Sequence, residues 1–131
     1  MTISIDFDGV IHQYAQGYKD GSIYDPPIKG SGKFIYDCMF EKGWSVFILS
    51  TRDPAQIKEW IESVLFQGKE LPFKITILPP DQKFWNEKKN IGIANRKLAA
   101  HVYIDDRGLK FEGNFEGMIG QLENFKTWQG K

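Results

Sequence analysis

Hydrophobic and polar residues alternate near the start of the chain, in residues 3–7 (ISIDF). Strand side chains point to opposite faces in turn, so this pattern predicts a β-strand with one buried face. The strand leads directly into Asp6-Phe7-Asp8-Gly9, and glycine allows the backbone to turn sharply after the second acid. Two carboxylates therefore lie at the carboxyl end of the strand, the edge of an open α/β sheet at which ligands usually bind.

Apolar residues at helical spacing then alternate with short, unbroken apolar runs, and the latter are typical of central parallel strands. The expected helices cover about residues 30–42, 53–67 and 118–122, the last as a short closing helix, and the expected strands cover residues 3–7, 44–49 and 102–104. Residues 73–78 and 90–94 also alternate like strands, but the sequence leaves open whether either joins the main sheet. This order of elements predicts an α/β fold, doubly wound around a mainly parallel sheet.

Composition narrows the class of protein. At 131 residues with 41% apolar content, we expect one domain over residues 1–131 with a core of its own. Seventeen basic residues balance seventeen acidic ones, so nucleic acid is a possible but unsupported partner and an anionic membrane is not favoured. Asp6 and Asp8 interrupt any signal segment, and no apolar run approaches the roughly 18 residues of a membrane span. We therefore expect a cytoplasmic protein, with the single cysteine, Cys38, as a buried structural thiol.

Polar side chains follow three of the predicted strands. Asp6 and Asp8 follow the first, Ser50 the second, and Asp105-Asp106 the one over residues 102–104. If these strands are parallel neighbours, the carboxylates crowd one sheet edge, where a cation is needed to keep them ionised together. A hard, oxygen-preferring ion fits, and Mg²⁺ fits best. Zinc is not indicated, because the two histidines and the one cysteine form no cluster in the sequence.

A carboxylate beside such an ion can attack the phosphorus of a phosphate ester, since the metal shields the negative charges from each other. The second acid, two residues on, could protonate the leaving oxygen and later activate water. The phosphate oxygens need donors, for which Ser50 and Lys97 are candidates.

These residues resemble a known family. Residues 6–10 (DFDGV) resemble the DxDx[TV] signature of the haloacid dehalogenase superfamily of phosphatases, and Ser50 with Arg52 is similar to its S-x-R second motif. Lys97 stands a few residues before residues 102–106 (VYIDD), which resemble the paired-Asp form of the fourth motif. The resemblance implies a Rossmann-like, three-layer, doubly wound fold.

The resemblance also implies roles. Asp6 would be the nucleophile and Asp8 the general acid/base, Ser50 and Lys97 would bind the phosphoryl group, and Mg²⁺ would bind Asp6, the backbone carbonyl of Asp8, Asp105 and Asp106. Superfamily members that cleave carbon–halogen or carbon–phosphorus bonds generally lack the second acid. Phosphoester hydrolysis is therefore the expected reaction.

The gaps between the motifs leave no room for the cap domain that usually closes such sites. The chain resembles the minimal, capless type, with residues 11–29 as a flap over the site. Its phosphorylated substrate would then be large, or a small molecule at a site that another copy of the chain covers in a homo-oligomer.

Several assignments remain open. Thr51 can serve in place of Ser50, Lys97 has other basic residues nearby, and Arg52 is either a phosphate contact or an ion-pairing scaffold residue. His12 is expected to be a surface or packing residue. A nucleotide or nucleic-acid-end phosphatase is an alternative, and a catalytically silent binding module is the alternative from another class.

Overall fold

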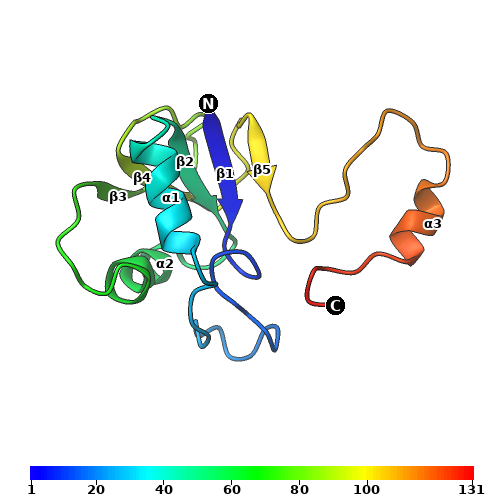
Figure 1. Ribbon diagram of the computed structural model, residues 1–131, viewed down its shortest axis with the longest axis horizontal. Coiled ribbons are helices and arrows are strands. Elements are labelled where there is room, and N and C mark those ends of the chain that lie inside the picture. The colour runs from blue at the N-terminus through cyan, green and yellow to red at the C-terminus, as the bar shows by residue number, and fades with distance from the viewer.

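The computed structural model describes residues 1–131 and is built around a five-stranded, wholly parallel sheet (Figure 1). The strands are β1 (Thr2–Asp6), β2 (Ser45–Leu49), β3 (Lys74–Ile77), β4 (Asn90–Ala94) and β5 (Val102–Ile104), in the order β3-β4-β2-β1-β5. The helices are α1 (Ser31–Phe40), α2 (Pro54–Trp60), its π-helical continuation η1 (Ile61–Leu65), and α3 (Met118–Glu123). The predicted α/β class with a parallel sheet is confirmed, and both segments that the sequence left open join the sheet.

The register of β1 determines where the site forms. Asp6 is paired with Leu49 at the end of β2, and Ile5 is paired with Ile104 at the end of β5. Because the three strands are parallel neighbours, their carboxyl ends lie at one edge of the sheet. The polar residues that follow these strands are therefore brought together, as predicted.

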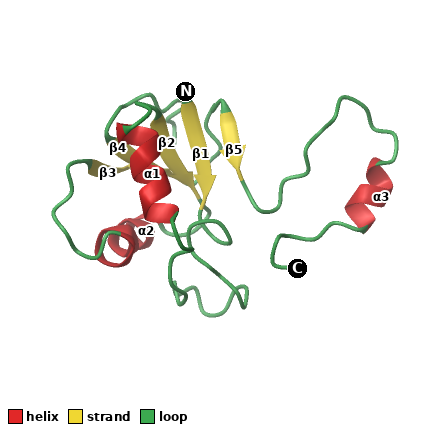
Figure 2. Ribbon diagram, viewed as in Figure 1, coloured by secondary structure: helices red, strands yellow, loops and turns green.

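Helices α1 and α2 pack on the same face of the sheet (Figure 2). One core cluster of 16 buried residues joins the inward side chains of both helices to alternate residues of β1, β2, β3 and β4. Cys38 is buried in this cluster, as expected, whereas Phe34 on the same helix is 47% exposed.

The opposite face of the sheet carries no helix. Its smaller core consists of five buried residues, namely Phe47, Leu78, Trp85, Ala94 and Leu98, and three of these come from the segments that flank β4. Trp85 packs so tightly over β4 that a Cβ at Gly92 would lie 3.0 Å from its ring. The layer that a doubly wound fold would build from helices is therefore formed here by loops.

The second helix also departs from its expected geometry. Its last turns are π-helical, with the Phe66 amide donating to the Ile61 carbonyl. This wider turn shifts the phase of the side chains that follow. Val64, seven residues after the buried Ile57, is consequently 41% exposed.

The C-terminal region leaves the sheet after β5, and its last residues contact the segment that follows β1. The expected helix over residues 118–122 forms as α3, but none of its residues is buried and it lies away from the sheet, so it does not close the fold (Figure 1). Beyond it, the indole N–H of Trp128 donates to the Gly9 carbonyl (2.8 Å), and the side-chain Nε2 of Gln129 donates to the Gln13 carbonyl (3.0 Å). The tail is thus attached to the segment that follows β1, although Trp128 itself is 64% exposed.

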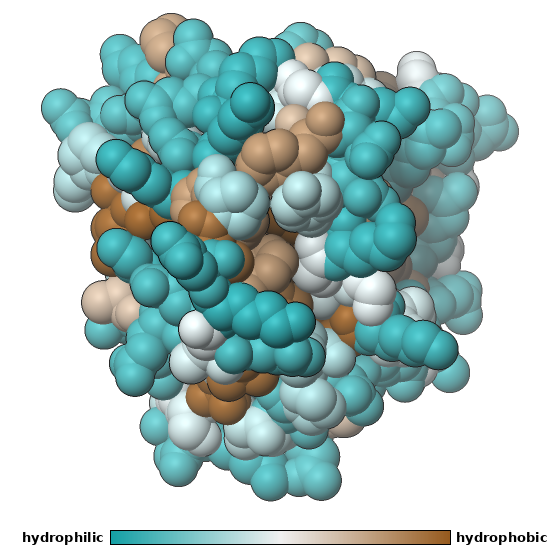
Figure 3. Space-filling view, turned by 60° about the vertical axis from the view of Figure 1, so that its left-hand side comes forward, coloured by the Kyte–Doolittle hydropathy of each residue, from teal (hydrophilic) through white to brown (hydrophobic).

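The face of the molecule in Figure 3 is mostly hydrophilic, with hydrophobic residues in a few small groups. No helix is both long enough and apolar enough to cross a membrane.

Candidate active site

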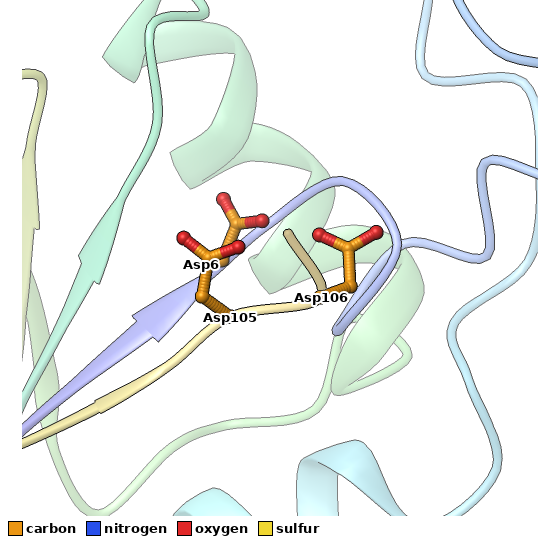
Figure 4. A group of neighbouring side chains, drawn as sticks. All are labelled: Asp6, Asp105 and Asp106. Carbon is orange, nitrogen blue, oxygen red and sulfur yellow. The ribbon is translucent and has the colours of Figure 1, made fainter. Parts of the chain in front are cut away.

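Three carboxylates meet at the carboxyl ends of β1 and β5. Asp6 is the last residue of β1, and Asp105 and Asp106 directly follow β5. One oxygen from each lies within 4.8 Å of the others, and the side chains gather in one small volume (Figure 4). Burial, followed by the charge of Asp105, raises the pKa of Asp6 from 3.8 to about 7.

Gly9 is what allows Asp106 to approach so closely. Its φ is +84°, and a Cβ at this position would lie 2.2 Å from Oδ2 of Asp106. The same carboxylate has a buried oxygen, Oδ1, without any hydrogen-bond partner. A buried, unpaired carboxylate oxygen is costly, and a cation bound among the three carboxylates would satisfy it.

These observations fit a hard divalent cation. The donors are three carboxylates, with no histidine or cysteine among them, and oxygen donors of this kind suit Mg²⁺ rather than zinc. The Asp8 carboxylate is not part of the cluster. Its side chain has different partners.

Asp8 is held between a histidine and an arginine. His12 Nδ1 lies 2.8 Å from Asp8 Oδ1, and the Nε of Arg52 donates to both Asp8 oxygens at 3.0 and 2.8 Å. Burial alone would raise the pKa of Asp8, but the hydrogen bonds from His12 and Arg52 and the charge of Arg52 outweigh it and lower the pKa below its usual value. The pKa values of Asp6 and Asp8 are thus shifted in opposite directions.

His12 was not identified as a site residue from the sequence. Its ring is fully buried and lies against the rings of Phe7 and Trp60, so the expected packing role is correct but incomplete. The Asp25 amide donates to Nε2 (3.0 Å), which leaves Nδ1 to carry the proton that is donated to Asp8. The spacing of four residues from Asp8, across the turn at Gly9, was the one signal in the sequence.

The predicted phosphate-binding residues after β2 have different surroundings. Ser50 is buried, and its Oγ accepts a hydrogen bond from the Arg52 amide (3.1 Å), which leaves its hydroxyl proton free to donate. Thr51 is exposed. The Arg52 side chain is only 9% exposed and also donates from Nη1 to the Gly21 carbonyl (2.8 Å). Of its two predicted roles, Arg52 fills the ion-pairing one in this structure.

Lys97 has a different partner. Its ammonium is 4.6 Å from the centre of the Tyr103 ring, on the edge strand β5. It forms no ion pair with Asp6, Asp105 or Asp106. The structure therefore brings together the four acids and Ser50 at one edge but leaves Lys97 on an aromatic ring.

Comparison of the chain with protein-family models, with curated proteins and with solved structures finds no match. Functional assignment therefore depends on the chemistry of these residues.

Proposed function

We propose that the chain is a Mg²⁺-dependent phosphomonoesterase that works through an aspartyl-phosphate on Asp6, on a Rossmann-like domain of the haloacid dehalogenase type. The observation that carries this proposal is the acidic cluster. Three carboxylates share a small volume at the ends of two adjacent parallel strands, and one buried oxygen of Asp106 has no partner. Such an arrangement favours a bound cation, and a cation beside a strand-end carboxylate suits phosphoryl transfer.

In this mechanism Asp6, Asp105 and Asp106 would hold the ion, which would supply positive charge that offsets the negative charge of the phosphate. A carboxylate oxygen of Asp6 attacks phosphorus, and the bond from phosphorus to the alcohol oxygen breaks. Water then attacks the phosphorus of the aspartyl-phosphate, which releases inorganic phosphate and restores Asp6. The free hydroxyl proton of Ser50 is available to bind a phosphoryl oxygen.

Asp8 acts as the general acid in the first step, in which it donates a proton to the leaving oxygen, and as the general base in the second, in which it accepts a proton from water. Its hydrogen bonds with His12 and Arg52 favour the ionised carboxylate. This state suits the second step, in which Asp8 accepts a proton. It also means that esters with good leaving groups, such as aryl phosphates, should react fastest, because they need little protonation.

The decisive experiment is hydrolysis of an aryl phosphate by wild type, Asp6→Asn and the control Asp81→Asn, which changes an exposed aspartate away from the acidic cluster. We expect turnover with Mg²⁺ by wild type and the control, none with EDTA, and none by Asp6→Asn, whose circular dichroism should remain that of wild type. Turnover by Asp6→Asn would contradict the nucleophile. Failure of wild type on a broad panel of phosphomonoesters would favour a silent binding module.

A further inference from the structure

A cavity of about 330 Å³ lies beside Asp8, between the flap (residues 11–29) and the start of α2. The flap contributes Tyr14 and Tyr18, and the segment leading into α2 contributes Thr51, Asp53 and Gln56. We call this space the flap cavity. Its volume is near the lower end of the roughly 300–1,000 Å³ of small-molecule sites.

The flap is held against α2 by its backbone. The Nη1 of Arg52 and the Nε2 of Gln56 both donate to the Gly21 carbonyl, at 2.8 and 3.1 Å. At its base, the Gln13 amide donates to the Pro26 carbonyl (3.1 Å), so the two ends of the flap are also joined. These hydrogen bonds fix the backbone of the flap at Gly21 and at its base.

The position of this cavity relates it to the proposed reaction, on which the inference rests. Asp8 lines it, whereas Asp6, Asp105 and Asp106 form the separate acidic cluster. Since Asp8 exchanges its proton with the leaving oxygen, the alcohol portion of the substrate must extend from the acidic cluster toward Asp8. The flap cavity is the space there that can receive it.

The charges around the flap cavity decide which alcohol it accepts. Arg52 is its only basic residue, and its guanidinium is already bound to the Asp8 carboxylate and the Gly21 carbonyl. Asp53 adds a second carboxylate, and only its Oδ1 accepts a hydrogen bond, from the Ala55 amide at 3.0 Å. The lining of the flap cavity therefore carries one net negative charge, from Asp8 and Asp53 against Arg52, which disfavours a second phosphate or carboxylate on the substrate.

Hydroxyl groups, in contrast, would find partners. Asp53 Oδ2 accepts no hydrogen bond, and the Thr51 hydroxyl makes none. Two tyrosine rings provide flat apolar surfaces beside these groups. We propose that the flap cavity binds the leaving group of a small, uncharged alcohol with several hydroxyls, such as a sugar. Monophosphates with a second anionic group, including phosphorylated nucleic-acid ends, are then poor substrates.

The test compares a matched pair of substrates, glucitol 6-phosphate and 6-phosphogluconate, together with a terminally phosphorylated oligonucleotide. Both members of the pair are open chains, and they differ only in a hydroxymethyl group or a carboxylate at the far end. Wild type with Mg²⁺ should show at least a tenfold higher kcat/KM for the neutral sugar ester than for the other two. Gln56→Lys adds a cation to the flap cavity and should lower the preference for the sugar ester over 6-phosphogluconate about tenfold. Because the readout is a ratio of kcat/KM values for two substrates, a loss of catalytic rate that affects both substrates equally cancels.

Gln121→Lys is the matched control, since it adds the same charge at an exposed position on α3, away from the flap cavity. It should keep the wild-type ratio. Equal rates on the sugar ester and 6-phosphogluconate, or a preference for the oligonucleotide, would overturn the inference and leave the proposed phosphatase intact. Absence of turnover on every ester, aryl phosphate included, would overturn both. The wild-type ratio suffices for the test if Gln56→Lys does not fold.

Discussion

Two aspartates separated by one residue have opposite electrostatic environments in this protein. Asp6 is half-buried beside Asp105, which favours its neutral form, whereas Asp8 accepts hydrogen bonds from Arg52 and His12, which favour its ionised form. Pairs of titratable groups whose pKa values are driven apart are typical of acid–base sites. Asp6, the proposed nucleophile, therefore needs a cation to be fully ionised at neutral pH, and Asp8 does not.

This difference predicts how stability depends on pH in the metal-free protein. Between its ordinary pKa of 3.8 and its folded-state pKa of about 7, Asp6 holds a proton in the folded state and loses it in the unfolded chain. The folded state therefore binds more protons in this range, and its stability should fall as pH rises through it. Melting temperatures in EDTA should show this decline in wild type and a shallower one in Asp6→Asn.

Added Mg²⁺ should remove much of the decline in wild type, because an ion bound to the carboxylates favours their ionised form. It should have little effect on Asp6→Asn. An identical pH dependence of the two proteins in EDTA would show that Asp6 is not the group responsible.

A second prediction at this scale concerns Gly9. Alanine at a positive φ costs about 1–2 kcal/mol, and at position 9 its Cβ would also meet Asp106 Oδ2 at 2.2 Å. Gly17 has a φ of +69° but no atom within 4 Å of the added Cβ, so Gly17→Ala is the control for backbone strain alone. Urea unfolding should show a larger loss of stability for Gly9→Ala than for Gly17→Ala. Calorimetry should show weaker Mg²⁺ binding by Gly9→Ala than by Gly17→Ala. Equal effects of the two variants would mean that the contact with Asp106 does not matter.

At the scale of elements, the tail after α3 supports the flap. The hydrogen bond from Trp128 to the Gly9 carbonyl connects residues 119 positions apart and adjoins Asp8. Trp128→Phe keeps an aromatic ring but removes this donor, at a cost of about 1 kcal/mol. Amide exchange at residues 9–13, measured by NMR, should become roughly fivefold faster. Phe115→Leu, which changes an exposed aromatic residue just before α3, should leave the exchange unchanged. Similar exchange in both variants would show that Trp128 does not hold residues 9–13.

The elements that were predicted well from the sequence are those whose pattern lies within a short stretch of residues. Alternation in residues 3–7 and the unbroken run in 44–49 depend on burial of those strands, and the acids that follow them need only parallel pairing to meet. The π-helical turn at residues 61–65 depends on tertiary packing, which no local pattern contains, and the four-residue spacing between Asp8 and His12 does not by itself specify their hydrogen bond. Lys97 was placed by its spacing before Asp105, and spacing does not specify where a long, exposed side chain lies.

At the scale of the whole molecule, the two faces of the sheet are stabilised unequally. The face under α1 and α2 has a core cluster of 16 buried residues, whereas the opposite face has five, covered by loops. Trp85 is one of these five, and the chain around it is also joined to β1, since Thr2 Oγ1 donates to the Trp85 carbonyl (3.0 Å). The smaller core thus depends on a few side chains.

This asymmetry predicts a large effect from a residue outside any helix or strand. Truncation of a buried aromatic residue costs about 3–5 kcal/mol, and no helix lies on this face to fill the space that Trp85→Ala would leave. Its neighbour Phe84 is 67% exposed, so Phe84→Ala should change stability by about 0.5 kcal/mol or less. Urea unfolding should show a much lower midpoint for Trp85→Ala at an unchanged m-value. If both variants lost equally little stability, the loops would not be the layer that covers this face. The sheet would then need another cover, such as a second copy of the chain.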